Sequence, residues 1–153
     1  MFIGTFENKI DRKGRVSVPY SFRQVLNTQT FNGIIAFASY REEAVEACGY
    51  DFLERINESM ETLDLFSKEH DDLATSILGS SHTLTFDPEG RIGMPPELRE
   101  YAGITDRAAF VGKGPLFQIW EPGALRRHMA EARSRAKAEG RSLSLRKPAA
   151  GTP

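Results

Sequence analysis

Apolar and polar residues alternate in four short stretches of the chain, and this alternation predicts β-strands on either side of two turns. The first pair of stretches covers residues 5–10 and 15–18, and the second pair covers 82–86 and 91–94. An apolar–polar period of two is typical of a strand that buries one face. We therefore expect two hairpin-like units of the same kind, one in each half of the chain.

The two units are copies of one motif. Residues 10–23 read IDRKGRVSVPYSFR and residues 86–99 read FDPEGRIGMPPELR, at a constant offset of 76 positions. Identical residues at this offset are Asp11/Asp87, Gly14/Gly90, Arg15/Arg91, Pro19/Pro95 and Arg23/Arg99. Such a gapless match indicates an internal duplication.

The repeated Asp-x-x-Gly-Arg segment has the composition of a type I β-turn. Asp is favoured at the first position of such a turn, and Gly at the fourth supplies a positive φ where the chain re-enters a strand. The residues interpreted as turn-forming are Asp11, Gly14, Asp87 and Gly90. Arg15 and Arg91 follow directly, and we expect each to pair in part with the aspartate of its own turn.

The remaining pattern predicts an α+β protein. Pro19 and Pro95 stop the strands and suit the start of short helices at 20–26 and 96–102. Further strands are expected at 33–38, 44–48, 108–112 and 116–120, and helices at 51–78 and 121–138. Because four short strands cannot bury both their faces alone, we expect the two halves to form one pseudo-twofold β-barrel or sandwich.

Composition places the chain among ordinary soluble globular proteins, with 40% apolar and 27% charged residues. No apolar run approaches the roughly 18 residues of a membrane-spanning helix, and the N-terminus lacks the pattern of a secretory signal. Cys48 is the single cysteine, so no intrachain disulfide can form. We therefore expect a cytoplasmic protein without a membrane partner.

The net charge of −1 conceals a strong segregation of charge. Residues 1–26 carry a net charge of +3, residues 42–72 carry −9, and residues 126–147 carry +6. Binding to a polyanion depends on where the positive charge lies and not on the overall total. A basic face is therefore compatible with this composition.

The tip of the first turn gathers three cations, Arg12, Lys13 and Arg15, within four residues. Such a cluster can contact phosphates, and the arginine fork can also read guanine. The second turn has Pro88-Glu89 at its tip and keeps only Arg91. If DNA is bound, we expect the first turn to supply the main contacts and Arg91 a secondary one. The alternative is that the first turn is polar only because it is solvated.

Catalytic signatures are weak. The stretch 69–72, Glu-His-Asp-Asp, resembles a metal cluster, but adjacent residues on a helix point in different directions. Residues 112–114, Gly-Lys-Gly, lack the rest of a phosphate-binding loop. Cys48 lies in an expected strand and is interpreted as a packing residue. We expect no enzyme activity, metal site, cofactor or small-molecule substrate.

Taken together, these motifs resemble those of the MraZ family of transcriptional regulators, in the SpoVT-AbrB superfamily. The pattern MFxGxxExxxDxKGRVSVPxxFR at residues 1–23 is similar to the family's N-terminus. The DxxGRI segment at 87–92 and the IWEP segment at 119–122 also fall where the family has them. The resemblance covers residues 1 to about 130.

The resemblance implies two tandem SpoVT-AbrB modules that form a pseudo-twofold swapped-hairpin β-barrel with flanking helices. The corresponding bounds are module 1 at 5–52, a linking acidic helix at 53–80, module 2 at 81–124, and a C-terminal helix with a flexible basic tail at 125–153. It also implies a ring-like homo-oligomer that binds direct repeats in double-stranded promoter DNA, represses the family's own division and cell-wall operon, and associates with the nucleoid. Lys13 and Arg15 are the implied DNA contacts, and Arg12 is added from its place in the turn.

Other classes remain open from the residues alone. An AbrB-like antitoxin would use a tail to neutralise a toxin, although the tail of this chain is short and basic. A protein that assembles without DNA would use the turns only to shape the barrel. An enzyme of an unrecognised kind is the third alternative.

Overall fold

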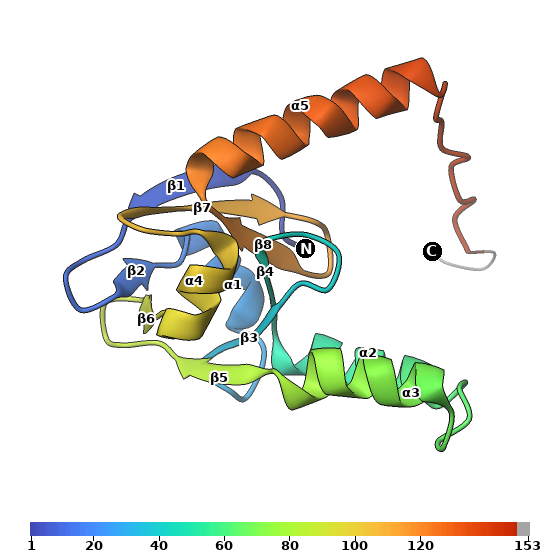
Figure 1. Ribbon diagram of the computed structural model, residues 1–153, viewed down its shortest axis with the longest axis horizontal. Helices are drawn as coiled ribbons and strands as arrows, with labels where there is room; N and C mark the ends of the chain where they lie inside the picture. Colours follow the sequence, from blue (N-terminus) through green and yellow to red (C-terminus); the bar gives the residue numbers. More distant parts are fainter. Residues whose placement is uncertain (150–153) are drawn as a thin grey trace. The chain divides into compact units, whose positions relative to one another are not determined.

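The strands of the two repeats pair with each other across the chain. The computed structural model describes residues 1–149 and divides into two compact units, Met1–Pro122 and Gly123–Pro153. In the first unit, six antiparallel strands form one sheet in the order β1 (Thr5–Lys9), β7 (Arg107–Gly112), β8 (Phe117–Trp120), β4 (Val45–Cys48), β3 (Gly33–Ala38) and β5 (His82–Thr85). The first strand of each repeat thus pairs with a strand of the other half, β1 with β7 and β5 with β3 (Figure 1).

The sheet is open, so the expectation of a closed β-barrel is wrong. Strands β1 and β5 form its two edges, and β2 (Arg15–Ser17) pairs with β6 (Arg91–Gly93) in a separate two-stranded sheet. These two strands have only three residues each and follow the turns directly. Because β2 and β6 pair with each other and not with β1 or β5, they neither extend nor close the large sheet. The architecture is a mixed helix and sheet fold with an antiparallel sheet.

One hydrophobic core contains equivalent residues of both repeats. Val16 and Ile92 face each other in the β2–β6 pair, and both are buried. The short helices α1 (Tyr20–Leu26) and α4 (Pro96–Ala102) follow Pro19 and Pro95, at the bounds that the sequence predicts. The ring of Phe22 on α1 packs edge-on against Phe2 with the centroids 5.3 Å apart. The helices and the small sheet are therefore fixed by the same core.

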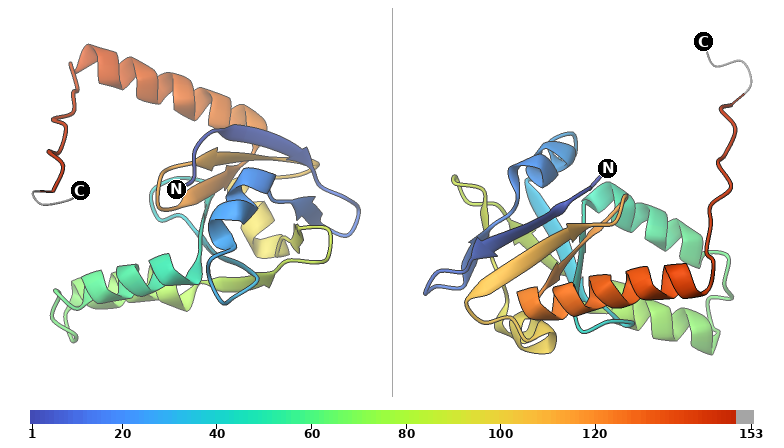
Figure 2. Two further views of the ribbon diagram at one scale, coloured as in Figure 1. Left: turned by 180° about the vertical axis from the view of Figure 1, so that it is seen from behind. Right: turned by 90° about the horizontal axis from the view of Figure 1, so that it is seen from above.

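The single long helix expected at 51–78 is wrong, because the chain reverses within it. The structure has α2 (Tyr50–Met60), α3 (Lys68–Leu73) and a π-helix, η1 (Ala74–Gly79). The hydroxyl of Ser67 accepts a hydrogen bond from the backbone N–H of His70 and so starts α3 with an N-cap. The reversal lets Met60 and Ile77 pack together with Phe37. Helix α2 thus lies side by side with the segment of α3 and η1 (Figure 2).

The second unit contains most of α5 (Pro122–Ala138) and then a basic segment without regular secondary structure to residue 149. Leu125 is buried, whereas the helix beyond Ala130 is exposed. The tail predicted to be flexible extends into residues 150–153, which lie outside the described residues. Within residues 1–149, no helix combines the length and the apolar character that crossing a membrane requires.

Candidate nucleic-acid interface

The first turn is organised around the carboxylate of Asp11. Its Oδ1 accepts hydrogen bonds from the backbone N–H groups of Lys13 (3.0 Å) and Arg15 (2.9 Å). Its Oδ2 accepts one from Nε of Arg15 at 2.8 Å. The N–H of Gly14 donates to the Asp11 carbonyl at 3.0 Å, and Gly14 has a φ of +79°, which favours glycine. The turn therefore holds Arg15 through its backbone and its side chain.

The second turn reproduces this geometry. Asp87 accepts hydrogen bonds from the N–H of Glu89, the N–H of Arg91 and Nε of Arg91, at 2.9, 2.9 and 2.8 Å. Gly90 has a φ of +77° and donates to the Asp87 carbonyl at 3.0 Å. Since both turns have the same internal bonds, these bonds belong to the shared frame and not to either tip.

The charges of the two turns reinforce this frame. The backbone N–H of Arg15, followed by its side chain and the N–H of Lys13, lowers the pKa of Asp11 below its ordinary value. The backbone N–H of Arg91 and then its side chain lower the pKa of Asp87 in the same way. The hydrogen bond to Asp87 raises the pKa of Arg91. Both carboxylates are thus ionised at neutral pH, where they bind their arginines most strongly.

The two turns differ in how much positive charge they present. Arg12 and Lys13 are exposed, and the side chain of Arg15 is 36% exposed. The side chain of Arg91 is 26% exposed, and its guanidinium lies 3.1 Å from Glu89 and 3.8 Å from Asp11 in addition to its bond with Asp87. Three carboxylates therefore surround Arg91, which makes the first turn the more cationic of the two.

The fold places the two turns beside each other. The N–H of Met94 donates to the Gly14 carbonyl at 2.9 Å, and the N–H of Val18 donates to the Gly90 carbonyl at 3.2 Å. The β2–β6 pair lies between the turns (Figure 1). The four predicted contact residues, Arg12, Lys13, Arg15 and Arg91, are thereby brought to one region, next to the two-stranded sheet.

Sequence reasoning missed two arginines beside these turns. Arg23 on α1 lies against Gly90, and Arg99 on α4 lies against Gly14. Both arginines recur at the offset of 76 as strictly as the aspartates and glycines do. That recurrence was the available signal, but nothing in the sequence indicated that each arginine reaches the turn of the other repeat.

The residues weighed for other chemistry are placed elsewhere. Within residues 1–149, no group of three His, Cys, Asp or Glu side chains could hold a metal ion, and His70 and Asp72 lie on or near the surface of α3. Cys48 is buried in β4, where its burial and then the nearby Glu46 raise the pKa of its thiol to about 12. The thiol is therefore protonated and unreactive at neutral pH, as a packing residue should be.

Comparison with known proteins identifies the family of this chain. The family described as "MraZ protein, putative antitoxin-like" matches residues 1–42 and 77–145, which include both turns. A protein named Transcriptional regulator MraZ from Parvibaculum lavamentivorans is 51% identical over 88% of this chain and 84% of its own length. Proteins of the same name from Pelagibacter ubique and Rickettsia bellii are each 44% identical, over 96% and 89% of this chain and 95% and 91% of their own lengths. This chain belongs to the MraZ family, whose members are transcriptional regulators and not enzymes.

Proposed function

We propose that this protein regulates transcription by binding double-stranded DNA in a sequence-specific manner through the first turn. The observation that carries the proposal is the contrast between two turns with the same frame and different tips. The frame requires an aspartate, a glycine and an arginine, and both turns have them. The cations at Arg12 and Lys13 are additional to that requirement, so they call for a functional explanation.

The chemistry of the tip fits a DNA groove. Exposed lysine and arginine side chains contact phosphates, and the forked guanidinium of arginine matches O6 and N7 of guanine. The half-exposed Arg15 is held in place by Asp11, which lowers the entropy that the side chain loses on binding. We assign Lys13 and Arg15 as the leading contacts, Arg12 as a further phosphate contact, and Arg91 as secondary.

A single loop offers few contacts, so its binding to one site should be weak and sensitive to salt. Several loops on one ring-like homo-oligomer could engage direct repeats together, and their effective concentration would multiply the affinity. We therefore propose that the protein binds direct repeats in its own promoter as a ring. On the family resemblance, the target is the division and cell-wall operon, the effect is repression, and the location is the cytoplasm, at the nucleoid.

The fold supports a corresponding domain proposal. The exchanged pairs β1–β7 and β3–β5 are what two interleaved SpoVT-AbrB modules would produce. We propose that the modules occupy 5–52 and 81–124, joined by the acidic segment 53–80, with a helix and a flexible basic tail at 125–153. A swapped-hairpin arrangement of these modules would account for the one core that residues of both repeats share.

The test is binding to DNA from upstream of the protein's own gene, by gel shift at near-physiological salt. The wild type should bind direct repeats, and Arg15→Ala should abolish binding while the elution volume on size exclusion stays the same. Arg91→Ala is the matched control, because it removes the same Asp–Arg bond from the second turn. Arg91→Ala should weaken binding less than Arg15→Ala does. Unchanged affinity of Arg15→Ala would reject the proposal.

The family description favours a second candidate, an antitoxin-like role. An antitoxin of this type would bind its toxin through a C-terminal segment, here the basic residues after α5. Deletion of residues 139–153 separates the two candidates, because it should leave promoter binding through the first turn in place and would abolish an antitoxin role.

A further inference from the structure

The turn glycines are covered, although turns are usually exposed. Gly14 and Gly90 are both buried. A Cβ atom built at Gly90 would lie 2.1 Å from Nη1 of Arg23, and one built at Gly14 would lie 3.2 Å from Nη1 of Arg99. Each turn of one repeat is therefore covered by the helix arginine of the other repeat, and glycine leaves the space that the guanidinium occupies.

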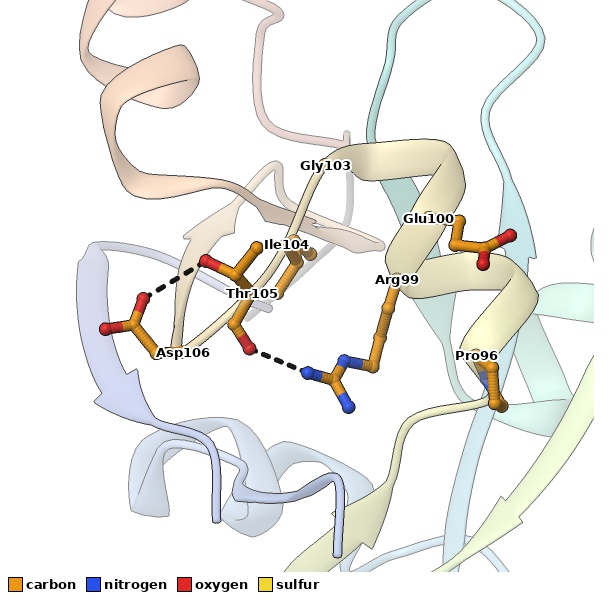
Figure 3. Close-up of a pocket in the computed structure, with 7 residues that line it drawn as sticks. All are labelled: Pro96, Arg99, Glu100, Gly103, Ile104, Thr105 and Asp106. Carbon is orange, nitrogen blue, oxygen red and sulfur yellow. Dashed lines mark hydrogen bonds between the residues drawn. The ribbon is translucent and has the colours of Figure 1, made fainter. Parts of the chain in front are cut away.

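Arg99 is fixed in a position that supports the first turn. Its Nη2 donates to the carbonyl of Thr105 at 2.7 Å, as Figure 3 shows. The next residue, Asp106, accepts the N–H of Ile10 at 2.8 Å, directly before the aspartate of the first turn. Arg99 thus links α4, the segment before β7 and the glycine of the first turn.

Arg23 holds the second turn in a related way. Its Nε donates to the carbonyl of Val18 at 3.1 Å, and the N–H of Val18 donates to the Gly90 carbonyl at 3.2 Å. The guanidinium is thereby placed over Gly90 from the end of β2. Both arginines are partly buried, and each donates to a protein carbonyl, so each side chain is anchored beside the turn that it covers.

We propose that Arg23 and Arg99 are crossed positioning residues, each of which fixes the turn of the other repeat. Arg99 sets the conformation of the first turn and hence the direction of Lys13 and Arg15. Arg23 sets the second turn, whose tip is Pro88-Glu89. The effect on DNA binding rests on the proposed function, whereas the effect on the turns does not.

The first test is hydrogen exchange of the protein without DNA. In Arg99→Ala, the amides of turn residues 13–15 should exchange about tenfold faster, because the guanidinium that covers Gly14 and is held by Thr105 is lost. In Arg23→Ala, the increase should instead fall on residues 89–91. Arg99→Lys and Arg23→Lys keep the charge without the fork, and they should give the same crossed pattern at smaller amplitude. An increase confined to the arginine's own repeat, or shared equally by both turns, would overturn the proposal.

The second test is binding to promoter DNA across a range of salt concentrations. Arg99→Ala should weaken binding several-fold and leave the slope of log K against log salt unchanged. A salt dependence that is weaker by about 0.9 in slope would mean that Arg99 contacts a phosphate directly. Unchanged affinity would mean that Arg99 has no role in presenting the turn. Either result refutes the effect of Arg99 on DNA binding. If the wild type itself does not bind DNA, the proposed function fails while the exchange result still decides the crossed support.

Discussion

Removal of the two exposed cations at the tip of the first turn should lower the salt dependence of DNA binding by a calculable amount. The double variant Arg12→Ala/Lys13→Ala keeps the turn, because Lys13 enters its frame only through the backbone N–H that donates to Asp11. Each phosphate contact contributes about 0.9 to the slope of log K against log salt, so two lost contacts should lower the slope by ~1.8 for each bound chain. Over a fourfold rise in salt, from about 50 to about 200 mM, the affinity gap between wild type and variant should narrow about 12-fold.

Fluorescence anisotropy with labelled DNA that contains one repeat measures this slope directly. Pro88→Ala/Glu89→Ala is the matched control, since it alters the same two positions of the second turn without removing a cation. Thermal melting should show that both variants keep the wild-type stability to within about 0.5 kcal/mol. If the slope of Arg12→Ala/Lys13→Ala equals that of the wild type, or if the control lowers it as much, the assignment of the tip to DNA is wrong.

Three further variants test the surroundings of the site. Glu89→Gln removes the ion pair at 3.1 Å that restrains Arg91, and it should raise DNA affinity by up to about fivefold in the same anisotropy assay, since exposed pairs are weak. Because the pKa of Asp87 is lowered in the folded protein, its stabilising effect is present above about pH 4 and is lost as the pH falls through the folded value. The difference in melting temperature between wild type and Asp87→Asn should therefore be largest at neutral pH and vanish in acid; a constant difference would contradict the ion pair. Phe22→Ala should cost about 3–5 kcal/mol in urea unfolding, because this ring is 1% exposed in the core.

The local part of the fold could be predicted because its signals are local. The spacing of Asp and Gly defines each turn within four residues, and the hydrogen bonds of both turns follow from it. Pro19 and Pro95 locate the starts of α1 and α4, because proline fixes φ at a value that suits a first helical turn. In the same way, the sequence alone shows that the second tip differs, with Pro88-Glu89 in place of the two cations.

Features that depend on distant residues could not be predicted from the pattern. Periodicity gives the faces of β1 and β5 but not their partners, so it could not show that the sheet stays open. The continuous helix failed because the residues at 61–67 fit a helix as well as a turn, and the packing of Met60 with Ile77 and the N-cap of Ser67 favour the reversal. The contact of Arg99 with Gly14 joins residues from opposite halves and leaves no mark on either segment alone.

The pairing across halves has a consequence for how the first turn can vary. Its frame depends on both halves, since Ile10 donates to Asp106 and Gly14 accepts from Met94. Half a chain therefore keeps the bonds inside the turn but lacks those that join it to β6 and to the segment before β7. The side chains of Arg12 and Lys13, however, take no part in those bonds. A duplicated frame of this kind lets one tip keep its cations for a ligand while the other loses them, without any change in the bonds that stabilise either turn.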